Sequence, residues 1–112
     1  MTNIRIPETE QAEFQRQQAE IYREIARELV ASTPEHWDSA VLGLSTTEEG
    51  IAHSIWSDEG HVDVVVPSMD LFGHVRQLEL LFLRYECLWK AATFRVFLAA
   101  EGNWAYEVDY EY

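Results

Sequence analysis

The chain has 112 residues and a mass of 13.0 kDa, the usual size of one domain. Twenty Asp and Glu residues against eight Lys and Arg give a net charge of −12, so the chain lacks the basic clusters that bind nucleic acids and anionic membranes. Hydrophobic residues make up 47%, which excludes a disordered chain and predicts a single domain over residues 1–112. The charge favours solubility or a basic protein partner.

The chain has one cysteine, Cys87, so a disulfide framework and a multi-cysteine metal site are excluded. We expect this cysteine to be a small buried apolar residue of a helix. Residues 1–6 have neither the basic start nor the apolar run of a secretory signal. The longest apolar region, residues 78–89, is interrupted by charges and is too short to span a bilayer. We therefore expect a cytoplasmic protein with no membrane partner.

Apolar residues at helical spacing predict a first helix from Pro7 to Val30, which Pro34 prevents from continuing. Three short segments bounded by turn residues then predict strands: residues 40–45, 51–57 and 61–66. Ser68 is a suitable N-cap for a second helix over residues 69–88. The sequence therefore alternates helical and strand patterns without an internal repeat or a linker.

The last segment predicts a β-hairpin, because apolar residues alternate cleanly on both sides of Glu101-Gly102-Asn103. Pairing Ala100 with Trp104 sets Arg95 opposite Asp109 and Phe97 opposite Glu107. The predicted fold is an α+β domain of order α-β-β-β-α-β-β, with two helices on one face of a five-stranded antiparallel sheet.

No catalytic or cofactor motif is present, so we expect neither a cofactor nor an enzyme. His36, His53, His61 and His74 fall on four different predicted elements, and only His61 and Asp63 have ligand-like spacing, so we expect no metal site. The five glycines are isolated, which excludes a phosphate-binding loop. A small hydrolase using the carboxylate stripe of the last strand, with His61, is the least favoured alternative, because an alternating acidic strand is typical of a solvated face.

Parity of the strands predicts the two faces of the sheet. The helices are expected to cover Val62, Val64, Val66, Trp104, Tyr106 and Val108. The open face would then carry Trp56, His61, Asp63, Val65, Arg95, Phe97, Glu107, Asp109 and Glu111. Aromatic residues among charges are typical of interface hot spots; the alternative is that Trp56 packs against an end of the first helix.

Distinct patterns stand toward the two ends of the chain: Ile21-Tyr22-x-x-Ile25-Ala26-x-x-Leu29 with Thr33-Pro34-Glu35-x-Trp37, and Thr93-Phe94-Arg95-Val96, Gly102-Asn103-Trp104 and Val108-Asp109-Tyr110-Glu111. In these residues the chain has a resemblance to YezG-like immunity proteins. This resemblance implies a cytosolic antidote that binds the C-terminal domain of a polymorphic toxin, often a nuclease, without chemistry of its own. An acidic antidote complements the basic surface that a nuclease needs.

The resulting hypothesis is an immunity protein that inhibits a basic toxin by stoichiometric binding. The predicted contact residues are Trp56, Asp63, Phe97, Glu107, Asp109 and Glu111, with Asp58 and Glu59 at the rim. The alternative is a homodimeric adaptor that uses the same face or the edge of the final strand.

Overall fold

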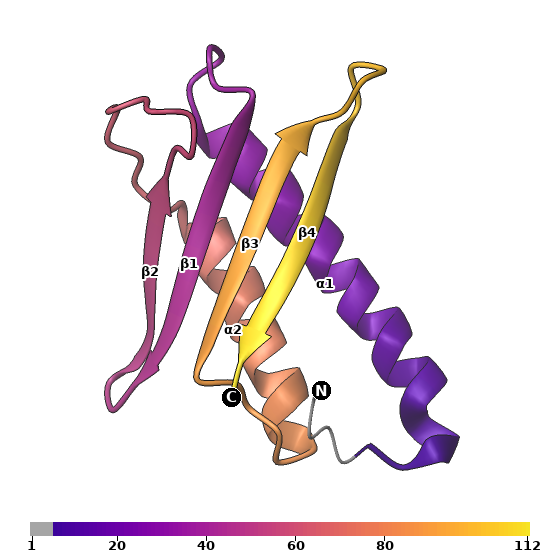
Figure 1. The fold of residues 1–112 in the computed structure, drawn as a ribbon. Helices are drawn as coiled ribbons and strands as arrows, with labels where there is room; N and C mark the ends of the chain where they lie inside the picture. Colours follow the sequence, from indigo (N-terminus) through magenta and orange to yellow (C-terminus); the bar gives the residue numbers. More distant parts are fainter. Residues whose placement is uncertain (1–5) are drawn as a thin grey trace.

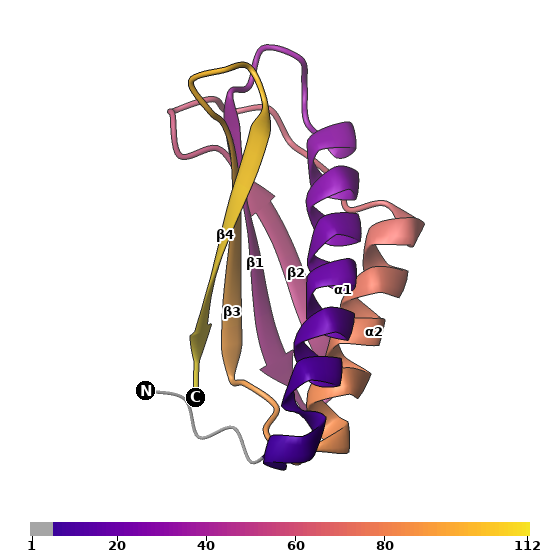
Figure 2. The ribbon, with the colours of Figure 1, turned by 90° about the vertical axis from the view of Figure 1, so that its right-hand side faces the viewer.

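The computed structural model describes residues 6–112, in which two helices pack against one face of an antiparallel sheet (Figures 1 and 2). The expectation about a secretory signal concerns residues 1–6, nearly all of which lie outside this range. The elements in chain order are η1 (Glu8–Glu10), α1 (Gln11–Ser32), β1 (Ser39–Thr47), β2 (Gly50–Trp56), α2 (Met69–Arg84), β3 (Ala91–Leu98) and β4 (Trp104–Glu111).

The sheet has the strand order β2-β1-β3-β4, and every neighbouring pair is antiparallel. The α+β class and the two helices are confirmed. The predicted five strands and the order α-β-β-β-α-β-β are wrong, because the sheet has four strands and only one hairpin precedes α2. Among the strands, the two central ones, β1 and β3, carry the most deeply buried residues, including Leu42 and Phe94.

The missing strand is the segment 61–66, which forms part of the connection between β2 and α2 (Figure 1). Its side chains alternate, but with the parity opposite to that predicted: Val62, Val64 and Val66 are exposed, whereas Val65 packs on the core. Side-chain contacts hold the segment, because Asp63 accepts a hydrogen bond from the Trp37 indole and His61 stacks on the same ring. Alternation therefore arises here without strand pairing.

The ends of the helices follow the predicted signals except at two points. Pro7 was expected to begin the first helix, but it precedes the short 3-10 turn η1, and α1 itself begins at Gln11. α1 ends at Ser32, two residues before Pro34, and the Ser68 hydroxyl accepts a hydrogen bond from the Leu71 backbone N–H at 3.1 Å. α2 ends at Arg84 rather than near residue 88, since Glu86 adopts a φ of 54°. The Glu86 and Cys87 N–H groups bond back to the carbonyls of Leu83 and Phe82, the pattern of a Schellman motif.

The hairpin of β3 and β4 forms as predicted, but its register differs by two residues. Leu98 pairs with Trp104 and Arg95 pairs with Glu107, so the expected pairing of Ala100 with Trp104 is wrong. Gly102, at φ 79°, takes the last of three loop positions, and the Ala99 N–H bonds to the Asn103 carbonyl at 2.7 Å. A shift of two residues preserves the faces, so Phe94 and Val96 remain on the helix side.

Contacts between aromatic rings connect α1 to the sheet. Tyr22 meets Phe94 edge-to-face at 5.2 Å between ring centroids, and its hydroxyl hydrogen-bonds that of Tyr110 on β4. Cys87 is buried in this core, as expected, but it lies after the end of α2 and not within the helix. Neither of the described helices has the length and apolar character needed to cross a membrane.

Candidate functional site

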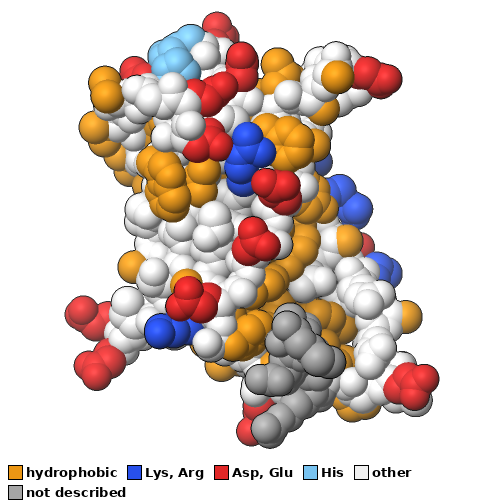
Figure 3. Space-filling model, viewed as in Figure 1, with side chains coloured by type: hydrophobic (Ala, Val, Ile, Leu, Met, Phe, Trp, Pro, Cys, Tyr) orange, Lys and Arg blue, Asp and Glu red, His pale blue; other side chains and the backbone are white. Residues whose placement is uncertain are grey.

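The sheet face that the helices leave open is turned toward the viewer in Figure 3. Below a short row that joins Phe97 to Ser39 and Ala105, three rows of side chains cross all four strands. The upper row joins Trp56, Val41, Arg95 and Glu107; the next joins Ser54, Gly43, Thr93 and Asp109; the last joins Ala52, Ser45, Ala91 and Glu111. The two lower rows carry small side chains on β2, β1 and β3. The face is therefore low in relief, with carboxylates along β4 and an indole on β2.

Trp56 lies on this face and not against α1. Its ring covers Gly43 on the neighbouring strand, where an added Cβ would come within 2.7 Å of Cζ3, and 44% of the residue remains exposed. The absence of a side chain at residue 43 thus allows the indole to lie flat on the sheet. A fixed, half-exposed indole loses little conformational entropy on binding and is suited to act as an anchor.

Arg95 on β3 organises the charged part of the open face. Its guanidinium lies 2.7 Å from the Asp58 carboxylate, 3.5 Å from that of Glu107 and 4.7 Å from the centre of the Phe97 ring. Hydrogen bonds from the Ser39 hydroxyl and from Arg95 lower the pKa of Asp58, so that this carboxyl is ionised at neutral pH. Two of the predicted contact residues, Asp58 and Phe97, are therefore held in place by a residue that was predicted only to share the face.

The remaining carboxylates of β4 are less constrained. Glu111 lies 3.8 Å from the Lys90 ammonium in an exposed ion pair, and Asp109 is exposed at the end of the middle row. Exposed pairs of this kind contribute little to stability. The Glu111 carboxylate can therefore leave Lys90 and pair with a cation of another protein, so the edge of β4 is available to a basic surface.

Asp63 and Glu59 are not part of the sheet face. Both lie in the connection 57–68, where Asp63 contacts Trp37 and His36, and Glu59 accepts the Asp38 backbone N–H at 3.2 Å. The expected position of Asp63 on the open face is wrong, because residues 61–66 do not form the strand that would have placed it there. The structure thus brings together Trp56, Asp58, Phe97, Glu107, Asp109 and Glu111, and separates Asp63 from them.

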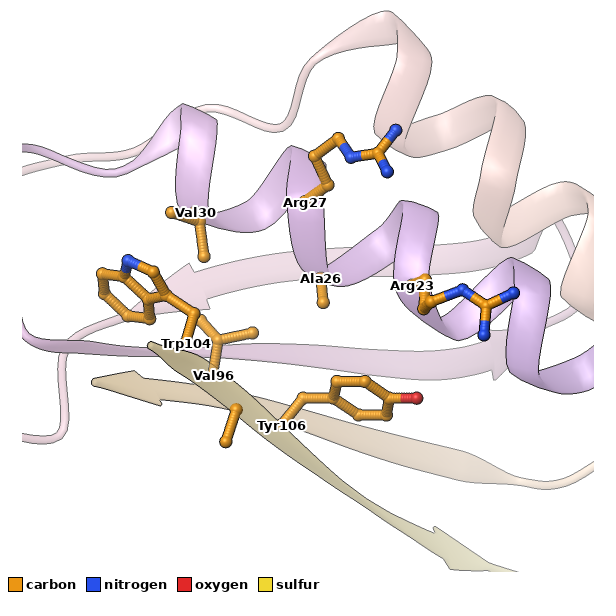
Figure 4. A pocket seen from close by; sticks show the side chains of 8 residues that line it. Arg23, Ala26, Arg27, Val30, Val96, Trp104 and Tyr106 are labelled. Carbon is orange, nitrogen blue, oxygen red and sulfur yellow. The ribbon is translucent and has the colours of Figure 1, made fainter. Parts of the chain in front are cut away.

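A second surface feature lies on the helix side of the sheet, where α1 diverges from β4 (Figure 4). Val30 and Ala26 of α1 face Val96, Trp104 and Tyr106 across a groove of about 450 Å³. Because α1 does not cover this corner, Trp104 and Tyr106 are about 40% exposed, although they were predicted to lie under the helices. Arg23 and Arg27 of α1 complete the lining of this apolar groove.

Replacing Gly43 with Ala is expected to displace the Trp56 indole from the open face, because the new methyl group would overlap the ring. The ring is at the end of a half-exposed side chain, so the fold should accommodate the change. The measurement is the position of the Trp56 indole N–H signal by NMR, which should move further than the signals of Trp37 and Trp89.

The matched control is Gly73→Ala, because an added Cβ at this position in α2 meets no atom within 4 Å. This variant should leave the Trp56 signal in place and stabilise the helix by about 1 kcal/mol. An unmoved Trp56 signal in Gly43→Ala would show that the indole does not cover the glycine.

Acidification from about pH 7 to about pH 5 is expected to destabilise the protein through His53. Its ring packs on Phe72 of α2, with 4.4 Å between centroids, in a recess that Arg76 and Glu79 also line. Loss of solvent lowers the pKa of His53 below its usual 6.5. The unfolded chain therefore binds a proton that the folded chain does not, and this contribution to stability is lost as the pH falls through 6.5.

The measurement is the urea midpoint of unfolding from pH 5 to pH 8 for wild type and His53→Gln. The variant should show a shallower pH dependence than the wild type. Parallel profiles for wild type and His53→Gln would contradict the assignment.

The arrangement described so far defines an α+β domain with one face covered by helices and one open face that combines aromatic and acidic side chains. Neither a protein-family model nor a curated protein matches this sequence. The relationship to YezG-like immunity proteins stays a prediction from the residues quoted for it.

Proposed function

We propose that this protein is an inhibitory binding domain whose open sheet face docks on a basic protein. One observation carries the proposal: the four-stranded sheet leaves a low-relief face that combines the exposed indole of Trp56 with the carboxylates of β4. A bare sheet face in a monomer is normally uniformly polar. An indole beside a floor of small side chains instead offers a site for a protruding side chain of a partner.

Charge supports a basic partner. The chain carries −12 overall, and the face itself has four carboxylates, on Asp58, Glu107, Asp109 and Glu111, against the cations of Lys90 and Arg95. Such a surface accelerates encounter with a positively charged protein and slows encounter with an acidic one. The association rate should therefore fall with rising salt.

The partner in this proposal is the C-terminal domain of a bacterial toxin, in agreement with the resemblance to immunity proteins. A nuclease domain fits best, because it needs a basic surface for its substrate. Binding without chemistry is sufficient for inhibition, since occupying that surface excludes the nucleic acid. The open face would be the contact and the helices would serve as its scaffold.

The test begins with affinity capture by the tagged protein from its source cells at low salt, followed by mass spectrometry. The captured protein is then purified and mixed with this domain, and co-expressed with it in cells. A basic protein that forms a one-to-one complex and is toxic only in the absence of this domain would establish the proposal. A captured protein whose toxicity is unchanged by the domain would reject it.

Light scattering on the isolated protein distinguishes the alternative, a homodimeric adaptor, from the proposed inhibitor. A stable dimer of twice the 13.0 kDa chain mass that buries Trp56 would assign the open face to a second copy of the chain. A monomer leaves the face available to another protein.

A further inference from the structure

Two connections that carry no regular structure bring three potential metal ligands together at one end of the sheet. His36 lies between α1 and β1, and His61 and Asp63 lie between β2 and α2. One ligand atom from each of these three side chains falls within 4.8 Å of the others. The sequence placed His36 on a separate element from the other two, so only the fold reveals the cluster. We propose that His36, His61 and Asp63 form a binding site for a divalent transition metal, with Zn²⁺ as the best fit.

The three ligand atoms need only small shifts to surround one ion. His36 Nε2 lies 2.9 Å from Asp63 Oδ2, and a tetrahedral zinc ion with bonds of about 2.0–2.1 Å separates its ligand atoms by about 3.3 Å. The His36–Asp63 separation must therefore widen by about 0.4 Å, and the widest separation in the cluster, at most 4.8 Å, must shorten by up to about 1.5 Å. The His36 and His61 rings already meet edge-to-face, with 4.9 Å between their centroids.

Neighbouring groups hold the carboxylate ligand in place. The buried Trp37 indole donates to Asp63 Oδ2 at 3.0 Å, and the hydrogen bonds from Trp37 and His36 lower the pKa of Asp63. Asp63 is thus ionised and oriented before a metal arrives, as expected for a ligand whose position is set by a second layer of contacts. Trp37 also stacks on His61, at 5.7 Å between ring centroids, and so positions two of the three ligands.

Ligand chemistry selects the metal. Two imidazoles and one carboxylate suit Zn²⁺ and similar transition metals, whereas Mg²⁺ and Ca²⁺ prefer oxygen atoms alone. Three protein ligands leave the fourth position for water, and the Glu59 carboxylate, 3.8 Å from His61 Nε2, lies close enough to contact it. The bound ion would cross-link the two connections beside the open face of the sheet.

The test uses the protein without a histidine tag and titrates it with ZnCl₂ by calorimetry, with CoCl₂ as a spectroscopic probe and MgCl₂ for comparison. Wild type should bind one Zn²⁺ per chain and show a higher melting temperature with zinc, because the ion binds only the folded state. Cobalt should give the visible absorption of a tetrahedral site. Magnesium should change neither quantity.

The variants assign the ligands. His36→Gln and Asp63→Asn should each weaken zinc binding at least tenfold, and His74→Ala should leave it unchanged. His36 has 57% of its side chain exposed, so its variant should fold like wild type even where changes at His61 disturb the contact with Trp37. Absence of zinc binding to wild type, or equal affinity in wild type and His36→Gln, would overturn the proposal.

Discussion

Phe94→Ala is expected to lower the free energy of unfolding by about 3–5 kcal/mol. Phe94 is fully buried on β3, under α1, where its ring meets Tyr22 edge-to-face. Truncation removes this contact and leaves a cavity between the helix and the central strands, which cannot both move to fill it. The measurement is urea unfolding followed by circular dichroism.

Phe97→Ala is the matched control, because it changes the same residue type three positions further along the same strand. Phe97 lies on the open face and stacks with Arg95 at 4.7 Å, so its loss should cost only about 1 kcal/mol. Comparable losses in the two variants would show that the core is not centred on the helix side of β3.

Most features that local patterns determine were predicted correctly from the sequence, although α1 begins and α2 ends four residues away from the expected positions. The helical repeat that includes Ile25 and Leu29 produced α1, Pro34 fixed its end, and Ser68 marked the start of α2. These signals act over one or two turns of chain, so the sequence contains all the information needed. The alternation of buried residues also gave the correct faces of β3 and β4.

The errors in the sheet arose where contacts between distant residues decide the structure. Residues 61–66 alternate like a strand, but they are held by the Trp37 side chain rather than by a neighbouring strand. The Trp37 contact joins residues more than 20 positions apart, and no local pattern reports it. Likewise, the two-residue difference in the β3–β4 register depends on which loop position Gly102 occupies.

The candidate site was predictable to the extent that it follows strand parity. Strand parity, by which residues two apart share a face, correctly grouped Trp56, Phe97 and the three carboxylates of β4. Asp63 was misplaced with its strand. The organising role of Arg95 and the meeting of His36 with His61 depend on strand order and on loop conformation, which one sequence does not determine.

These placements define the variant that should affect partner binding most strongly. Reversing the charges of Glu107, Asp109 and Glu111 to Lys is expected to weaken binding of the proposed basic partner at least 100-fold, about 3 kcal/mol. The three side chains line one edge of the open face, so the change replaces attraction with repulsion along the whole edge. The weaker binding should come mainly from a slower association rate, and the difference from wild type should shrink at high salt.

The matched control carries the same three reversals at Glu8, Glu35 and Glu86, which are exposed and lie outside the sheet. Both triple variants change the net charge from −12 to −6, because each reversal adds two positive charges. A long-range effect of total charge would weaken binding equally in the two proteins. Loss of binding confined to the β4 variant would assign the contact to the open face, whereas undiminished binding by a folded β4 variant would exclude that face as the site.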